Sequence, residues 1–183
     1  MRTSHTILAP LIAAFLALPH LAAPDAQARS PIRKPGRFGL GLGLTTLSTG
    51  VSAKYVVDRV GALQFGLGSL GCCGARHRWG EWGGVGVGVD YLFEMPTIAI
   101  AGRAFELAWN FGPGLGFGFD ARNHDRYYGD DDVAFAASFV LGLEFDFIPI
   151  PLDIVLEWRP NFLFVPAVDV DPLDFTAHAR GYF

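Results

Sequence analysis

Residues Leu173 to Phe183 read Leu-Asp-Phe-Thr-Ala-His-Ala-Arg-Gly-Tyr-Phe, so apolar or small residues alternate with polar ones up to a terminal phenylalanine. Successive side chains of a β-strand point to opposite sides, and this stretch therefore predicts a strand with one apolar and one polar face. Soluble domains seldom end on such a strand. Membrane-spanning barrels require it, because the outward face contacts lipid and the inward face lines a polar interior.

The same alternation recurs through residues 37–183 and predicts an all-β fold, an eight-stranded antiparallel up-and-down transmembrane β-barrel. The first hairpin is expected to turn at Ser48 to Gly50. Pro113 and Pro160 each predict a bulge or an early strand end, because a closed barrel has no free edge for a residue without an N–H group. The expected strands cover residues 38–45, 51–58, 63–68, 84–94, 105–119, 134–147, 152–162 and 173–183.

The amino terminus predicts export. Arg2 precedes an apolar run over residues 7–18, and Ala26-Gln27-Ala28 offers the small residues of a signal-peptidase site. Residues 1–28 are therefore expected to be a signal peptide. Residues 29–36 contain two prolines and three basic residues, which predicts a flexible, exposed leader. No later apolar run has the length of a spanning helix, so the mature chain would cross a membrane only as a closed sheet.

Composition narrows the function classes. The net charge of −4 and the lack of a basic patch argue against nucleic acid as a partner. The 23 glycines and 14% aromatic residues suit close-packed strands and argue against disorder. Cys72 and Cys73 are adjacent, so they provide no disulfide scaffold, and either a strained bridge or unpaired thiols remain open. No metal or cofactor is expected, because separated pairs of ligands are missing.

Alternation alone leaves two barrels open. A secreted soluble barrel would bury the Val, Leu and Phe rows and bind an apolar ligand there, whereas a membrane barrel turns them outward. Repeated glycines on the opposite face favour the second, since a narrow eight-stranded interior has little room. The long connections at residues 70–83, 120–132 and 165–172 would then lie outside the cell, and the short ones at 58–61 and 148–151 in the periplasm. The predicted location is the bacterial outer membrane.

Several segments together resemble a known family. They are Gly39 to Gly43, the glycine repeat from Gly112 to Gly118, Leu156 to Pro160, and the ending Arg180 to Phe183. The chain resembles small, uncharacterised eight-stranded outer-membrane barrels built on the plan of the transmembrane domains of outer-membrane proteins A and X. The resemblance implies that the barrel-insertion machinery recognises the terminal Phe183. Gly181 departs from the pattern, because that position is usually aromatic or aliphatic.

Charged residues on the polar face predict a cluster inside the barrel. Poorly hydrated charges must pair, so the cluster is interpreted as a salt-bridged plug, and no open pore is expected. A narrow ion path or ligand site is the alternative. Glu157 and Arg180 are expected to be neighbours. The cluster comprises Lys54, Asp90, Glu106, Glu144, Asp153, Glu157, Arg159 and Arg180.

An enzymatic role is the alternative to this plug. Ser138 and His178 lie on the polar face with Glu157 on the strand between them, which supplies the residue types of a lipid acyl hydrolase or transferase. One intervening strand would hold Ser138 and His178 roughly 10 Å apart. Direct proton transfer would then fail. The sequence therefore favours a protein that is not an enzyme.

The long loops are the expected contact surfaces. Trp79 and Trp82 lie in one loop and Arg126, Tyr127 and Tyr128 in another, and such residues are typical of binding surfaces. They would contact an unknown external ligand or, equally well, lipopolysaccharide and outer-membrane lipid. The sequence predicts a structural or surface-binding role and leaves the partner open.

Overall fold

The computed structural model describes residues 30–70, 84–120, 133–165 and 168–183. This part of the chain forms strands and one 3-10 helix, η1 (Pro31–Arg33). The strands are β1 (Phe38–Thr45), β2 (Ser48–Val56), β3 (Gly61–Leu70), β4 (Gly84–Glu94), β5 (Ala99–Ala101), β6 (Phe105–Asp120), β7 (Val133–Phe147), β8 (Leu152–Trp158), β9 (Asn161–Val165), β10 (Asp169–Asp171) and β11 (Phe175–Tyr182).

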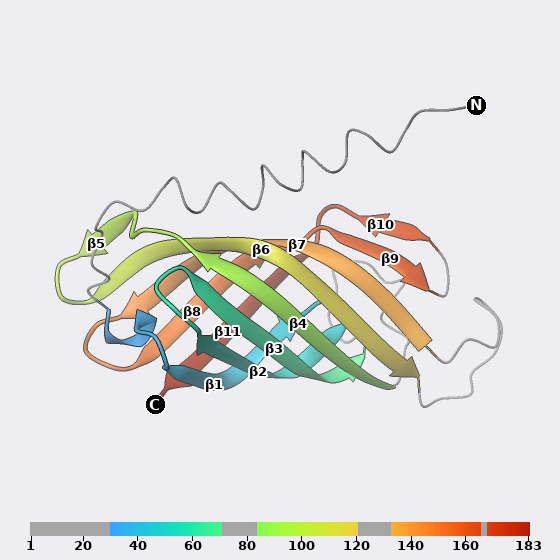
Figure 1. Ribbon diagram of the computed structural model, residues 1–183, viewed down its shortest axis with the longest axis horizontal. Coiled ribbons are helices and arrows are strands. Elements are labelled where there is room, and N and C mark those ends of the chain that lie inside the picture. The colour runs from blue at the N-terminus through green and yellow to red at the C-terminus, as the bar shows by residue number, and fades with distance from the viewer. Residues whose placement is uncertain (1–29, 71–83, 121–132, 166–167) are drawn as a thin grey trace, which may run out of the picture.

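Eight of these strands close into a barrel (Figure 1). Hydrogen-bonded neighbours follow the order β7-β8-β11-β1-β2-β3-β4-β6, and β6 pairs with β7 to complete the ring. Every pairing is antiparallel. β5, β9 and β10 are additions to this ring. The predicted all-β fold with an eight-stranded antiparallel barrel is confirmed.

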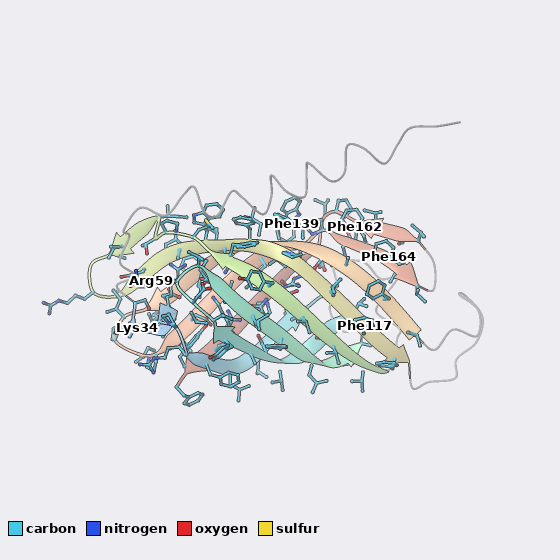
Figure 2. The ribbon with its side chains drawn as sticks, in the orientation of Figure 1. Lys34, Arg59, Phe117, Phe139, Phe162 and Phe164 are labelled. Carbon is cyan, nitrogen blue, oxygen red and sulfur yellow. The ribbon has the colours of Figure 1, made fainter. Side chains whose placement is uncertain are left out.

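The two ends of the barrel differ. One end, here called the terminal end, holds η1, the carboxy terminus and the short connections at residues 57–60 and 148–151 (Figure 1). The other, called the loop end, holds β9 and β10. Lys34 and Arg59 mark the terminal end, and Phe117 and Phe164 lie toward the loop end (Figure 2).

The two faces of the sheet divide as the alternation predicts. In β4, Val85 and Val89 are exposed, whereas Gly88 and Asp90 are buried. Side chains of one strand alternate between faces, so the same division repeats around a closed ring. Apolar rows thus face outward, and glycines and charges face the interior.

The first turn lies elsewhere than predicted. Thr45 pairs with Ser48, so the turn is Thr46-Leu47, and the expected turn residues Ser48 to Gly50 belong to β2. Leu47 adopts a left-handed backbone conformation with φ 66°, which costs roughly 1–2 kcal/mol for a residue with a Cβ. Sequence rules assign such turns to Gly or Asn, which explains the wrong prediction.

The prolines behave differently from each other. Pro160 separates β8 from β9, so the predicted strand end occurs there. Pro113 lies inside β6 and keeps its pairing with Phe139 on β7, without a strand end. On its other side, the β4–β6 ladder skips from Asp90–Gly114 to Phe93–Phe111 in unchanged register, so the missing donor costs local pairs and no bulge forms.

The predicted exposed leader is wrong for residues 30–33. Ser30 and Ile32 are fully buried, and η1 lies at the mouth of the terminal end. The Ser30 side chain caps η1 by accepting from the Ile32 N–H, and Pro31 suits its first position. Proline and basic residues cannot extend a strand ladder, but they can pack in the open end of the barrel. The predicted signal peptide lies outside the described residues.

Candidate functional site in the barrel interior

The turn between β1 and β2 fills the interior of the barrel at the loop end. The turn between β1 and β2 folds inward, and Thr46 is fully buried. A Cβ on Gly86, Gly88 or Gly116 would come within 3.0 Å of the turn residues Thr45 to Leu47. The glycines of β4 and β6 therefore make room for this turn, a more specific reason than the narrow interior that the sequence suggests.

Arg159 is at the centre of the first group of charges, next to the turn on the side toward the terminal end. Its guanidinium forms two parallel bonds of 2.9 Å to the Asp90 carboxylate. It also donates to Glu157 at 2.6 Å and to the Thr46 hydroxyl at 2.9 Å. The bidentate geometry matches the planar fork of arginine to a carboxylate, and it joins the inward turn to β4 and β8.

Glu157 is the acceptor at the centre of the interior. Besides Arg159, its carboxylate accepts bonds from Gln64 and from the Thr176 hydroxyl, each at 3.0 Å. His178 lies 3.1 Å from it through Nε2, and the His178 Nδ1 lies 2.9 Å from the Ser52 hydroxyl. A neutral imidazole protonated on Nε2 satisfies both contacts. The result is a continuous chain, Ser52–His178–Glu157.

Arg180 binds a different carboxylate than predicted. It pairs with Asp153 across the β8–β11 ladder, with Nη2 2.8 Å from Oδ2. Its Nη1 donates to Gln64 at 2.6 Å, and Gln64 in turn donates to Glu157. The prediction of Glu157 and Arg180 as neighbours is therefore wrong: Gln64 bridges them. Alternation gives the face of a residue but not its height, and Glu157 stands opposite Thr176.

Lys54 forms the next group toward the terminal end. Its ammonium contacts both Glu144 oxygens, at 2.7 and 2.8 Å, and a Glu94 oxygen at 2.7 Å. Asn110 adds a bond to Glu144 at 3.2 Å. The Lys54 ammonium thus pairs with two carboxylates, those of Glu94 and Glu144.

The last group closes the terminal end. Arg33 of η1 donates to Glu94 at 3.0 Å and to the Met95 carbonyl at 2.7 Å, and its Nε lies 3.8 Å from Asp146. Burial lowers the pKa of the Arg33 guanidinium, but the carboxylates of Glu94, Glu144 and Asp146 outweigh burial and raise it above its usual value. The Ser30 N–H donates to Glu106 at 3.2 Å.

All eight residues of the predicted cluster have buried side chains. Five residues outside the predicted cluster also take part in the ion pairs or connect them: Arg33, Glu94, Asp146, Gln64 and Tyr182. All of these except Arg33 lie on the polar face by alternation, which was the available signal. Ser138 bonds to Thr46 and not to His178. The predicted loop residues Trp79, Trp82, Arg126, Tyr127 and Tyr128 lie outside the described residues.

Comparisons with protein-family models, curated proteins and solved structures find no match. Among the described residues, no helix has the length and hydropathy needed to span a membrane.

Proposed function

We propose that this chain is an integral protein of the bacterial outer membrane, closed to solutes and without enzymatic activity, with a structural or surface-binding role. The observation that carries the proposal is the distribution of side chains, with apolar residues on the outside of the barrel and charged residues inside. Among the described residues, thirty large hydrophobic side chains are at least 37% exposed, whereas Lys54, Arg159 and Arg180 are at most 1% exposed. Water-soluble monomers rarely expose apolar patches of this extent, and a hydrocarbon surrounding accounts for them.

Aromatic pairs near both ends support the same proposal. Phe105 contacts Phe145 with ring centroids 5.9 Å apart toward the terminal end. Phe117 contacts Phe135 at 4.8 Å toward the loop end. Rings of aromatic residues at two heights are typical of proteins that sit between two membrane interfaces. Phe183 is 76% exposed. In the proposal, the barrel-insertion machinery recognises this residue.

A lumen filled with paired side chains supports a closed barrel. Arg159, Glu157, Gln64, Arg180 and Asp153 form one connected network. Moving an ion through it would require breaking charge-assisted bonds in a poorly hydrated space. Any role in recognition is therefore assigned to the outer loops, with lipopolysaccharide or an unidentified external ligand as the partner.

One pair of substitutions tests the membrane surrounding. Leu156 is 52% exposed in the middle of β8, and Ile150 is 51% exposed in the connection before it. Arginine at a bilayer midplane costs about 2–4 kcal/mol, and near an interface about 0–1 kcal/mol. Leu156→Arg is therefore expected to destabilise the protein in lipid vesicles, and Ile150→Arg is not. Equal tolerance of both, together with recovery of the protein in the soluble periplasmic fraction, would reject the proposal.

A second candidate, acyl hydrolysis, rests on the Ser52–His178–Glu157 chain. The residue types and contacts are those of a nucleophile, a base and an orienting acid. Ser52 is completely buried, however, so a substrate would have to displace the β1–β2 hairpin. A serine-reactive fluorophosphonate probe separates the two functions: labelling that disappears in Ser52→Ala supports the enzyme, and no labelling above that of Ser52→Ala supports the closed barrel.

A further inference from the structure

The mouth of the terminal end has more carboxylates than cations. Glu94, Glu106, Glu144 and Asp146 are buried there, and two cations, Arg33 and Lys54, are found near them in the described part of the chain. One oxygen of Glu106 and one of Asp146 have no hydrogen-bond partner and no ion-pair contact among the described residues. Buried carboxylates without partners are costly. The mouth thus has buried carboxyl oxygens on Glu106 and Asp146 that could accept hydrogen bonds from a further donor.

The chain itself leads into this mouth. Arg33 is fixed by Glu94 and by the Met95 carbonyl, and three residues earlier the backbone N–H of Ser30 points to Glu106. Ser30 is completely buried although it stands at the beginning of the described segment. Consecutive Cα atoms are about 3.8 Å apart, so the residue before Ser30 is within reach of the Glu106 carboxylate.

We propose that the acidic mouth formed by Glu94, Glu106 and Asp146 is a binding site for the processed amino terminus of this same chain. Cleavage after Ala28 leaves Arg29 as the first residue, with an α-ammonium and a guanidinium. Both groups donate hydrogen bonds, which the oxygens of Glu106 and Asp146 without partners in the described part of the chain could accept. The inference rests on the proposed function, because it requires export and cleavage of the signal peptide.

Processing then has a structural consequence. In the precursor, the nitrogen of Arg29 belongs to a neutral peptide bond and provides no charge. After cleavage, the same nitrogen is an ammonium, which a buried carboxylate binds far better than an amide. Signal-peptide removal would therefore strengthen the binding of the amino terminus to the acidic mouth.

The test uses the full chain, exported and purified in detergent from the cell fraction that contains it. Intact-mass spectrometry identifies the first residue. An N-hydroxysuccinimide ester then labels the α-amine at neutral pH, and peptide mapping measures the rate at that residue. Labelling of the folded protein is expected to be at least about tenfold slower than labelling of the heat-unfolded protein, because burial excludes the reagent and the ion pair keeps the amine protonated.

Variants identify the partner of the amine. In the Glu106→Gln/Asp146→Asn double variant, labelling of the folded protein should rise toward the unfolded rate. Asp58→Asn is the matched control, since Asp58 is exposed in a turn at the same end and should leave the rate unchanged. If the double variant does not fold, the comparison of folded and unfolded wild type still decides.

Three outcomes overturn the inference: a first residue other than Arg29, an amine that reacts equally fast in both states, or equal protection in the double variant. Recovery of the protein outside the outer membrane would instead reject the proposed function. The labelling experiment on the purified barrel is read separately from that result.

Discussion

The two halves of the interior are filled in contrasting ways. Toward the loop end, the inward turn occupies the space that glycines leave, and Arg159 satisfies two carboxylates and a hydroxyl. Toward the terminal end, side chains fill the space, and oxygens of Glu106 and Asp146 lack partners among the described residues. The contrast shows that an eight-stranded barrel can be closed by backbone or by charge. Only the second leaves carboxylate oxygens of the predicted cluster and its neighbours without hydrogen-bond partners among the described residues.

The largest effect is expected from the Arg159 network in the half toward the loop end. Arg159→Met would leave Asp90 and Glu157 without their shared cation, and breaking a buried ion pair in this way costs about 3–5 kcal/mol. Urea unfolding in detergent, followed by the heat-dependent gel shift, measures the loss. Lys34→Met, at an exposed position of the terminal end, is the control. A loss below about 1 kcal/mol would show that the Arg159 network is hydrated and replaceable.

The inward turn provides the next test of the contrast. A Cβ on Gly86 would overlap the Leu47 carbonyl, which is backbone and cannot rotate away. Overpacking of this kind costs about 1–3 kcal/mol, so Gly86→Ala is expected to lower the unfolding free energy by that amount. In Gly181→Ala the added carbon meets nothing closer than 3.9 Å. Equal stability of the two variants would mean that the turn does not fill the interior.

Asp146 offers a prediction whose sign depends on processing. In the precursor refolded into detergent, Asp146→Asn should stabilise the barrel by about 1 kcal/mol, because it removes a buried carboxyl that has no hydrogen-bond partner among the described residues and whose one close cation there, Arg33 Nε, is 3.8 Å away. In the processed protein that gain is expected to vanish or reverse. Unfolding both forms with and without the substitution gives the difference. An identical gain in both would separate Asp146 from the amino terminus.

The sequence predicted correctly those features that depend only on the alternation of side chains along a strand. The alternation of Val85 and Val89 with Gly88 and Asp90 predicted which face each residue occupies, and the closed ring follows from repeating it. The height of a residue needs the register between strands, which alternation does not contain. Arg180 therefore paired with Asp153 rather than Glu157.

The remaining failures are of another kind. The turn at Thr46-Leu47 uses a leucine in a conformation that turn rules assign to other residues, and tertiary packing overrides that preference. Ser30 and Arg33 belong to no alternating or helical pattern of apolar residues, so their local sequence does not indicate that they lie in the interior. Their place becomes predictable only once the acids of β4, β6 and β7 are known to lie at one height.

The smallest expected effect concerns Asp174, at the loop end outside the paired network. Burial, and then the nearby Asp171, raise the pKa of the Asp174 carboxyl, although Asn161 donates to it. An aspartate with a raised pKa in the folded state makes the protein less stable as pH rises through that pKa. Asp174→Asn should therefore stabilise the barrel by a few tenths of a kcal/mol at pH 7. The gain should shrink as the pH is lowered and wild-type Asp174 becomes protonated. A gain that is constant from pH 4 to pH 7 would assign the effect to the hydrogen bond with Asn161 rather than to the charge of Asp174.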